Sequence, residues 1–166
     1  MWSTLVPDAR LSSVTEITPA FLAERGLSAL ILDLDNTLAV WNGPEPAPGV
    51  EPWLASLRAS GVGHIILSNN GRARAEDFGR RVRVPVLARA GKPRAGAFRR
   101  ALRALGADAG ATAVVGDRLL MDVWGGNRVG LYTVLVAPID RRELWATHLV
   151  RRAEDVMVGR LPSVGA

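Results

Sequence analysis

Short, largely apolar segments rich in β-branched residues alternate with helix-like segments along the chain. The apolar segments are residues 29–32, 63–67, 84–87, 112–115 and 132–136. Continuous apolar runs of this length are typical of parallel strands that are covered on both faces. The pattern predicts an α/β fold with a Rossmann-like, doubly wound parallel sheet of about five strands.

Helix-start and helix-stop residues place helices between these strands. Thr18 followed by Pro19 is typical of a helix start. Further helices are expected around residues 54–58 and over residues 93–106, each closed by a glycine at or just beyond its end. Residues 41–52 contain four prolines and two glycines, and this composition predicts a loop.

The composition excludes several classes of protein. The 166 residues are 48% hydrophobic and include no cysteine, which excludes disulfides, thiolate zinc sites and cysteine nucleophiles. No uncharged apolar run reaches the roughly 18 residues of a membrane span, and the first residues lack the pattern of a signal peptide. We expect a single globular domain over residues 1–166, located in the cytoplasm.

The positive charge of the chain comes almost entirely from arginine. Lys and Arg total 21 against 16 Asp and Glu, yet Lys92 is the only lysine. An ammonium is a compact point charge that fits beside a small oxyanion, whereas a guanidinium is a wide planar fork. Lys92 is therefore a candidate for binding an anion. The net charge of +5 suggests anionic partners, although arginine-rich composition alone produces the same charge.

Polar residues of the kinds used in phosphate chemistry follow four of the predicted strands. They form the segments Asp33–Thr37, Ser68–Asn70, Gly91–Pro93 and Gly116–Asp122. The carboxyl ends of parallel strands lie at one edge of a sheet, so the four segments are expected to converge. Each alone has an ordinary explanation as a strand-end turn, a helix cap or a loop. Their joint occurrence at successive strand ends favours a binding site.

The acidic residues of this group suit a divalent cation. Asp33 and Asp35 are separated by one residue, so in extended backbone their carboxylates point the same way. With Asp117 as a third carboxylate, the hard oxygen ligands suit Mg²⁺. Together with Lys92 and the donors of the Ser68–Asn70 segment, the ion would hold a phosphoryl group. An aspartate at such a site can form an aspartyl phosphate, and its neighbour can act as general acid and base.

The segment Asp33–Leu38, with the sequence DLDNTL, resembles motif I of the haloacid dehalogenase (HAD) superfamily, whose pattern is DxDxT. Ser68 resembles motif II and Lys92 motif III, while Gly116–Asp122 resembles motif IV, GDxxxxD. Their order and spacing match over roughly residues 28–136.

Three further segments resemble the YqeG-type branch of HAD subfamily IIIA phosphatases, which is related to the phosphatidylglycerophosphate phosphatases. They are Leu5–Asp8, Ser68–Asn70 and Gly125–Arg128. Arg118 departs from the glutamine expected in that branch, which bears on substrate contacts more than on the chemistry.

The resemblance implies that Asp33 is the nucleophile and a Mg²⁺ ligand. It implies that Asp35 is the general acid and base and binds Mg²⁺ through its backbone carbonyl. Asp117 would bind the metal directly, and Asp122 would act in or behind its ligand shell. For the substrate, it implies that Ser68 and Asn69 hydrogen-bond the phosphoryl oxygens and that Lys92 neutralises their charge.

The segments in which HAD proteins carry cap domains are short here. Residues 38–62 and 70–91 must already hold a loop, two helices and a strand, and pieces below about 40 residues seldom fold alone. We therefore expect a capless HAD-like domain with an open site. An open site favours a bulky phosphorylated substrate, such as a phospholipid headgroup or a macromolecule, or an oligomeric partner that covers it.

The basic, partly aromatic residues 141–152 have two interpretations. They could contact anionic lipid as a peripheral membrane segment, or less readily RNA, or they could form a solvated helix face.

Two classes of function share the predicted chemistry. The first is a Mg²⁺-dependent phosphatase acting on a substrate such as phosphatidylglycerophosphate, and the second is a non-catalytic, receiver-like phosphoryl-accepting or scaffold module. Receivers place an acidic pair after the first strand, the accepting aspartate after the third and the lysine after the fifth. Here Asp33 and Asp35 follow the first predicted strand, Lys92 the third and Asp117 the fourth. This order favours the phosphatase.

Overall fold

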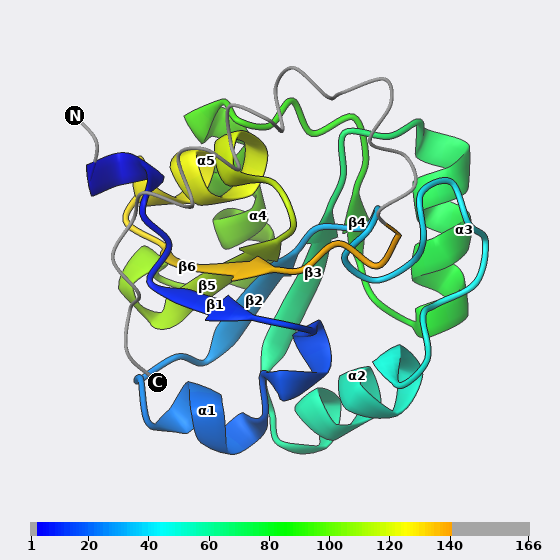
Figure 1. Cartoon of the computed structure of the whole chain (residues 1–166), viewed down its shortest axis with the longest axis horizontal. Helices are drawn as coiled ribbons and strands as arrows, with labels where there is room; N and C mark the ends of the chain where they lie inside the picture. The colour runs from blue at the N-terminus through cyan, green and yellow to red at the C-terminus, as the bar shows by residue number, and fades with distance from the viewer. Residues whose placement is uncertain (1–2, 141–166) are drawn as a thin grey trace.

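The computed structural model describes residues 3–140 and shows a parallel sheet with helices on both faces (Figure 1). The sheet has six strands in the order β1-β6-β5-β2-β3-β4. The α/β fold with a doubly wound parallel sheet is thereby confirmed. The strands are β1 (Ala9–Leu11), β2 (Ala29–Leu32), β3 (Gly63–Leu67), β4 (Val86–Leu87), β5 (Thr112–Gly116) and β6 (Tyr132–Val136).

The helices of the described residues lie between these strands. They are α1 (Pro19–Ala23), α2 (Val50–Ala59), α3 (Arg72–Val82), α4 (Ala95–Leu105) and α5 (Trp124–Asn127). Thr18 caps α1 as predicted, because its hydroxyl accepts the Phe21 amide at 3.1 Å. The start of α2 corrects the predicted loop over residues 41–52. Pro52 lies in the first turn of this helix, where an amide hydrogen would have no intrahelical acceptor, so proline is tolerated there.

The sixth strand, β1, was not predicted, because three residues with a central arginine form no apolar run. It is fixed against β6 by Asp8, whose carboxylate accepts the amide and hydroxyl of Thr133 at 2.7 and 3.0 Å. The predicted strand 84–87 is also shorter than expected, because only Val86 and Leu87 pair with β3. Proline cannot donate to a sheet ladder, which excludes Pro85 from regular pairing on the donor side.

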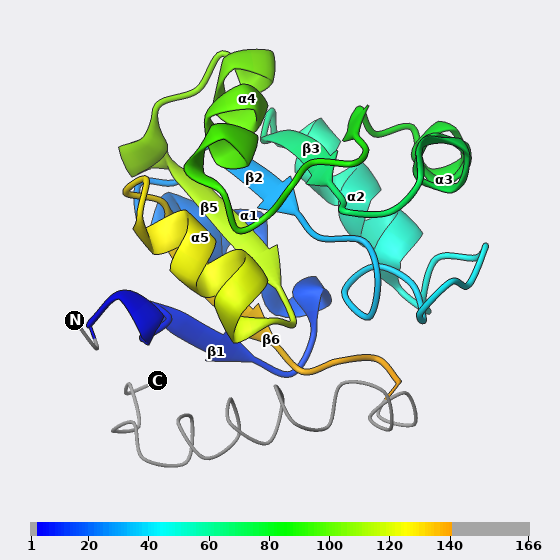
Figure 2. The same cartoon turned by 90° about the horizontal axis from the view of Figure 1, so that it is seen from above.

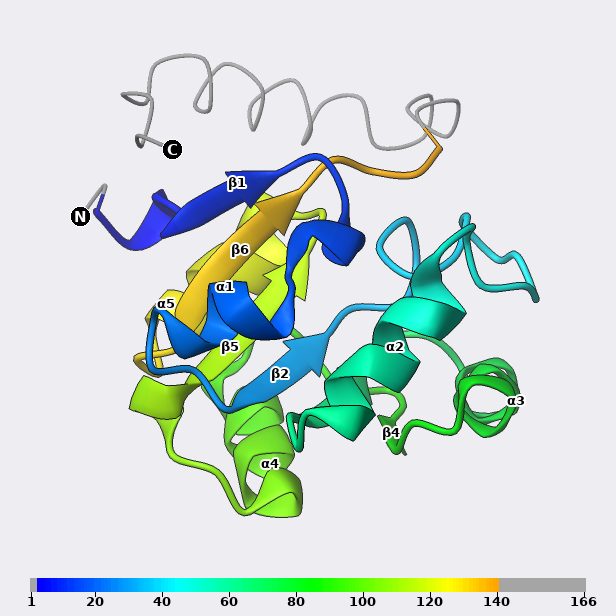
Figure 3. The same cartoon turned by 90° about the horizontal axis from the view of Figure 1, so that it is seen from below.

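The residues of β2 alternate between two apolar layers, one on each face of the sheet. Leu30 and Leu32 belong to the layer that contains Leu54 of α2 and Phe78 of α3. Ile31 points to the opposite layer, which α4 covers with residues such as Phe98. Figures 2 and 3 show α4 and α5 on one face and α1 and α2 on the other. Burial on both faces explains why β2 is apolar at every position.

The centre of the sheet positions the polar segments. Strand β2 pairs with β3 on one side and β5 on the other, and Leu32 lies opposite both Ile66 and Val115. All three strands are parallel, so the residues that follow them emerge at one edge. The chain continues from β3 outward to β4 and from β5 outward to β6, which makes β2 the switch point of the topology.

Within the described part of the chain, this edge of the sheet carries no cap domain. Between β2 and β3 the chain forms one loop and α2, and between β3 and β4 it forms α3. Within residues 3–140, no helix combines the length and the apolar character that a membrane crossing requires. The basic segment 141–152 lies outside the described residues.

Gly126 in α5 allows a close approach between that helix and the sheet. A β-carbon at this position would lie 2.4 Å from Val114 Cγ1 and 3.0 Å from Thr133 Cγ2. We predict that Gly126→Ala lowers the free energy of unfolding by about 1–3 kcal/mol, because the added methyl group overpacks a filled core. Denaturant unfolding checks this value. Gly96→Ala in α4 is the matched control, since no atom lies within 4 Å of its added β-carbon, and it should leave stability equal or slightly higher.

Candidate active site

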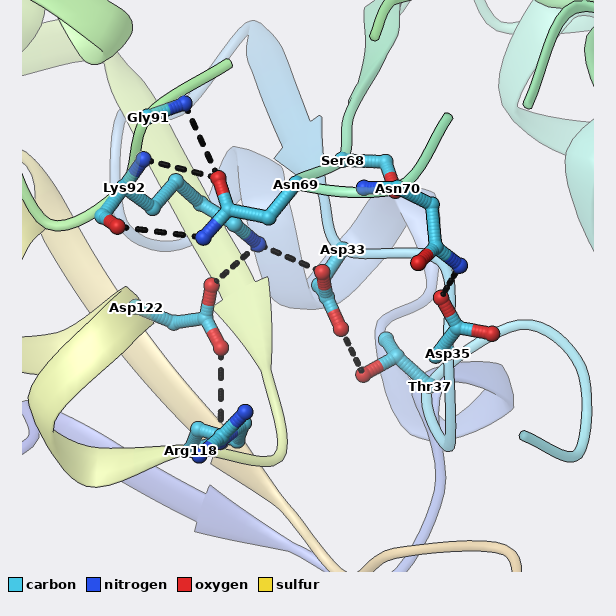
Figure 4. Close-up of polar contacts among 10 residues, drawn as sticks. All are labelled: Asp33, Asp35, Thr37, Ser68, Asn69, Asn70, Gly91, Lys92, Arg118 and Asp122. Carbon is cyan, nitrogen blue, oxygen red and sulfur yellow. Dashed lines mark hydrogen bonds and ion pairs between the residues drawn. The ribbon is translucent and has the colours of Figure 1, made fainter. Parts of the chain in front are cut away.

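The polar segments predicted from the sequence converge at the carboxyl edge of the sheet (Figure 4). Asp33 follows β2, Ser68 follows β3 and Asp117 follows β5. Lys92 lies in the loop that leads from β4 to α4, and Asp122 lies in the π-helical turn Leu119–Val123. All five residues are buried, although charged and polar residues are usually exposed. Residues up to 89 positions apart therefore form one buried polar cluster.

Lys92 lies at the centre of this cluster. Its ammonium contacts Asp33 Oδ1 and donates to Asp122 Oδ1 at 2.7 Å, and its side chain is only 3% exposed. A buried ammonium requires such partners, because an unpaired charge in the protein interior is very unfavourable. The single lysine of the chain is thus held in a site that admits only a compact cation.

For both Lys92 and Asp122, burial and the charge of the ion-pair partners shift the pKa in opposite directions. Burial alone would lower the pKa of the Lys92 ammonium, but the Asp122 and Asp33 carboxylates reverse that effect and raise it above its ordinary value. Burial raises the pKa of Asp122 above the usual carboxyl range, although the Lys92 ammonium opposes this. Lys92 therefore stays charged at neutral pH.

Asp33, Asp117 and Asp122 together have the composition of a metal centre. One carboxylate oxygen from each lies within 4.8 Å of the others, and all three side chains are buried. Buried carboxylates at this spacing repel one another, and hard oxygen donors suit a divalent cation such as Mg²⁺ or Mn²⁺. The side chain of Asp35, the fourth predicted ligand, does not join this group. The sequence analysis predicts that Asp35 binds the metal through its backbone carbonyl, and the grouping of side-chain carboxylates does not test this. The assignment of Asp35 as a metal ligand therefore stays a prediction.

The position of Asp122 depends on the residue that ends β5. A β-carbon on Gly116 would lie 2.3 Å from the Asp122 carboxyl group. The same carboxyl accepts the Arg118 amide through Oδ2 at 3.3 Å. Glycine at 116 is therefore required by the side chain that packs over it.

Asn69 holds the loop that carries Lys92. Its side-chain oxygen accepts the amides of Gly91 and Lys92 at 2.9 and 2.8 Å, and its nitrogen donates to the Lys92 carbonyl at 3.0 Å. These three bonds join the end of β3 to the lysine loop (Figure 4). The predicted contact of Asn69 with phosphoryl oxygens stays a prediction. The neighbouring Ser68 is 1% exposed, and its hydroxyl accepts the Asn70 amide at 3.1 Å.

The carboxylate of Asp35 lies on the other side of Asp33 from Lys92 (Figure 4). Its Oδ1 accepts the Asn42 amide at 3.1 Å and pairs with Arg74 at 2.8 Å, and its Oδ2 contacts the Asn70 side chain. Burial raises the pKa of Asp35, while the Asn42 amide and the Arg74 guanidinium partly offset this. A carboxyl group with a raised pKa is suited to donate and accept protons.

Several residues of this site escaped the sequence analysis. Thr37 donates to Asp33 Oδ2 at 3.3 Å, and Arg74 contacts Asp35 from helix α3. Thr37 could have been found from the DxDxT pattern itself, whereas nothing distinguishes Arg74 from the many other arginines. Asn127, in a segment that resembles the YqeG branch, instead donates to the carbonyls of Thr4 and Val6 at 2.8 and 3.1 Å. It therefore fastens the N-terminal segment to α5.

Comparisons with known proteins agree with this geometry. The HAD-hydrolase-like family model matches residues 89–159. The protein named "Probable phosphatase YqeG" of Bacillus subtilis is 35% identical over 160 residues, covering 96% of this chain and 93% of that protein. The chain belongs to this family of HAD-like phosphatases. It is accordingly an enzyme, a phosphatase of the HAD type, and the resemblance noted in its motifs is confirmed.

A second relative and a solved structure extend the comparison. The chloroplastic phosphatidylglycerophosphate phosphatase 1 of Chlamydomonas reinhardtii is 30% identical, over 98% of this chain and 64% of that protein. The structure of NagD from Escherichia coli K-12 superposes with a TM-score of 0.52 at 14% identity, over 72% of this chain and 92% of that chain. At this identity the superposition supports the fold alone.

The dimensions of the Lys92 site predict a strong effect of Lys92→Arg. The wider guanidinium cannot replace an ammonium that contacts Asp33 and Asp122 at 3% exposure. We expect kcat on an aryl phosphate to fall at least about tenfold, with a loss of about 1–3 kcal/mol in stability from overpacking. Steady-state kinetics and denaturant unfolding measure the two effects. A variant with parental kcat and parental stability would show that the site does not select for an ammonium.

Proposed function

We propose that the protein is a Mg²⁺-dependent phosphomonoesterase that works through an aspartyl phosphate on Asp33. The observation that supports this most strongly is the buried contact of Asp33 with the Lys92 ammonium, beside two further carboxylates. The contact fixes the Asp33 carboxylate at the edge of the sheet, next to a positive charge that can balance the negative charge of a phosphoryl group.

The proposed reaction has two steps. A carboxylate oxygen of Asp33 attacks phosphorus, and the bond from phosphorus to the substrate oxygen breaks. Asp35 gives its proton to that oxygen, so the alcohol leaves in neutral form. In the second step Asp35 takes a proton from water as the water oxygen attacks phosphorus, which releases inorganic phosphate and restores Asp33.

The remaining site residues hold the transferred group. Lys92 balances the charge of the phosphoryl oxygens, and Ser68 donates its hydroxyl hydrogen to one of them, since the oxygen of that hydroxyl accepts the Asn70 amide. Asn69 contributes by fixing the lysine loop and is proposed to contact the phosphoryl group as well.

Asp33, Asp117 and Asp122, with the backbone carbonyl of Asp35, are the residues proposed to hold Mg²⁺. The three clustered carboxylates of this group fit a hard divalent cation better than any monovalent one. When bound, the cation would supply positive charge that offsets the charge of the phosphoryl group and of the carboxylates.

The nucleophile assignment predicts the behaviour of Asp33→Asn. The amide keeps the size of the side chain but removes its charge, its nucleophilicity and one proposed metal ligand. We expect hydrolysis of p-nitrophenyl phosphate to fall by about 10³-fold or more, and chelation of Mg²⁺ to abolish parental turnover reversibly. Phosphate release, with and without EDTA, provides the measurement.

Asp77→Asn on α3 is the control for this experiment, because the exposed Asp77 carboxylate pairs with Arg80 on the surface, and it has no other ion pair within residues 3–140. It should retain parental kinetics. Substantial turnover by Asp33→Asn would contradict the nucleophile assignment, and parental turnover undiminished by EDTA would contradict the metal.

We also propose that the substrate is bulky and amphiphilic, with a phospholipid headgroup as the first candidate. A relative of this chain is named as a phosphatidylglycerophosphate phosphatase. Independent support comes from the surface beside the site. Among the described side chains, three large hydrophobic ones are exposed, namely Val40, Trp41 and Ile139, at 41%, 42% and 39%.

These three residues, which we call the apolar rim, surround the turn that follows Asp33. Val40 and Trp41 come directly after Ala39, which forms a bridge with Asp35. Ile139 arrives from the far end of the described chain, and its amide donates to the Asn36 carbonyl at 3.0 Å. Exposed apolar side chains gathered at one place mark contact surfaces, and tryptophan is favoured at membrane interfaces. The apolar rim is therefore proposed to touch the lipid that carries the substrate.

This role of the apolar rim predicts a selective defect in Trp41→Ser. We expect kcat/KM for phosphatidylglycerophosphate in anionic vesicles to fall about tenfold, because the apolar area of the indole no longer contributes to binding. Hydrolysis of soluble p-nitrophenyl phosphate by the same variant should stay within about twofold of the parent, since Trp41 is not among the residues proposed to hold the phosphoryl group or the metal. Equal losses on both substrates would indicate a defect of the site itself and would refute contact with lipid.

A further inference from the structure

Arg74, in the first turn of α3, contacts the candidate general acid from outside the four sequence motifs. Its Nη2 atom pairs with Asp35 Oδ1 at 2.8 Å and donates to the Gly43 carbonyl at 3.0 Å. The side chain is 24% exposed and that of Asp35 is 12% exposed, so solvent screens this pair less than a surface pair. One atom of Arg74 thus joins the carboxylate to the loop that follows motif I.

Three hydrogen-bond donors contact the Asp35 carboxylate and set its orientation. Asn70 contacts Oδ2, while the Asn42 amide and Arg74 share Oδ1. Of these donors only Arg74 carries a charge, and charge-assisted hydrogen bonds hold a carboxylate more firmly than neutral ones. Arg74 also fastens the loop that presents the Asn42 amide, because it binds the next residue, Gly43. Its removal would loosen two of the three contacts together.

Burying Arg74 at this position is energetically unfavourable, which indicates that its contact with Asp35 has a function. Its Nε and Nη1 atoms are buried and have no hydrogen-bond partner within residues 3–140. Buried donors without partners destabilise a fold, so a purely structural role would be served better by a side chain without them. The ion pair with Asp35 and the hydrogen bond to the Gly43 carbonyl offset part of this cost.

We infer that Arg74 is a positioning residue, which orients Asp35 toward the oxygen of the leaving group. This inference rests on the proposed function, since it presumes that Asp35 protonates that oxygen. The role has a chemical signature. An alkoxide is a poor leaving group and needs the proton, whereas p-nitrophenolate leaves readily without one. Loss of orientation should therefore slow alkyl phosphates far more than activated aryl phosphates.

Arg81 provides a matched control on the same helix. Its Nη1 donates to both carboxylate oxygens of Glu45, at 2.8 and 2.7 Å, so it fastens the same loop two residues beyond Gly43. The polar contacts of the Asp35 carboxylate are instead with Asn42, Asn70 and Arg74. Arg81→Gln therefore loosens the loop without removing a partner from the candidate general acid.

The test compares benzyl phosphate with p-nitrophenyl phosphate, two single-ring substrates with leaving groups of very different basicity. We expect Arg74→Gln to lower kcat on benzyl phosphate by about tenfold or more while KM changes little. On p-nitrophenyl phosphate its kcat should stay within about threefold of the parent. Arg81→Gln should lower kcat equally on both substrates or leave both values unchanged. Should Arg74→Gln fail to fold by circular dichroism, Arg74→Lys, which keeps the charge, is measured on the same pair.

A double-mutant cycle with Asp35→Asn completes the experiment. If Arg74 acts through Asp35, the double variant should be no slower on benzyl phosphate than Asp35→Asn alone. Equal losses on the two substrates, or additive losses in the cycle, would overturn the positioning role and leave the proposed function intact. A parent protein that hydrolyses neither phosphate would overturn the proposed function and this inference with it.

Discussion

The contact of one buried ammonium with two buried carboxylates is the constraint around which the rest of the site is arranged. Asp33, Asp117 and Asp122 bring three carboxylates within 4.8 Å, and like charges at that distance oppose folding unless cations balance them. Lys92 supplies one positive charge from the protein itself. Its loop must therefore be held accurately, and the three bonds of Asn69 do so. The parallel strands β2, β3 and β5 form the scaffold that brings these distant residues together.

Much of this arrangement could be predicted from the sequence because it depends on local pattern. Strands buried on both faces are continuous apolar runs, and β2, β3 and β6 have the bounds that those runs indicate. The site residues directly after those strands were also predicted, because parallel topology alone brings strand ends to one edge. The single lysine drew attention by composition, and its burial at 3% exposure accounts for why arginine does not stand there.

The features that escaped prediction depend on which elements meet in three dimensions. Strand β1 is defined by its pairing with β6 and by Asp8, not by hydrophobicity of its own. Helix α2 begins inside a proline-rich segment because proline is compatible with a first helical turn. Arg74 is one arginine among 20, and only the approach of α3 to the turn after Asp33 distinguishes it. Asn127 is the opposite case: it lies in a segment that resembles the family, but its side chain fastens the N-terminal segment that precedes β1.

The lack of a cap over the carboxyl edge, within residues 3–140, has a kinetic consequence. Enzymes that close a lid over the reacting group shield it from solvent and often turn over at the rate of lid opening. Among the described residues, no separate domain stands between bulk water and the edge where the phosphoryl group would be held. The intermediate on Asp33 would consequently partition toward water rather than toward a competing alcohol, so the architecture favours hydrolysis over phosphoryl exchange. In the proposed reaction, departure of inorganic phosphate would likewise await no movement of a cap within residues 3–140, which would leave the chemical steps and encounter with the substrate to set the rate.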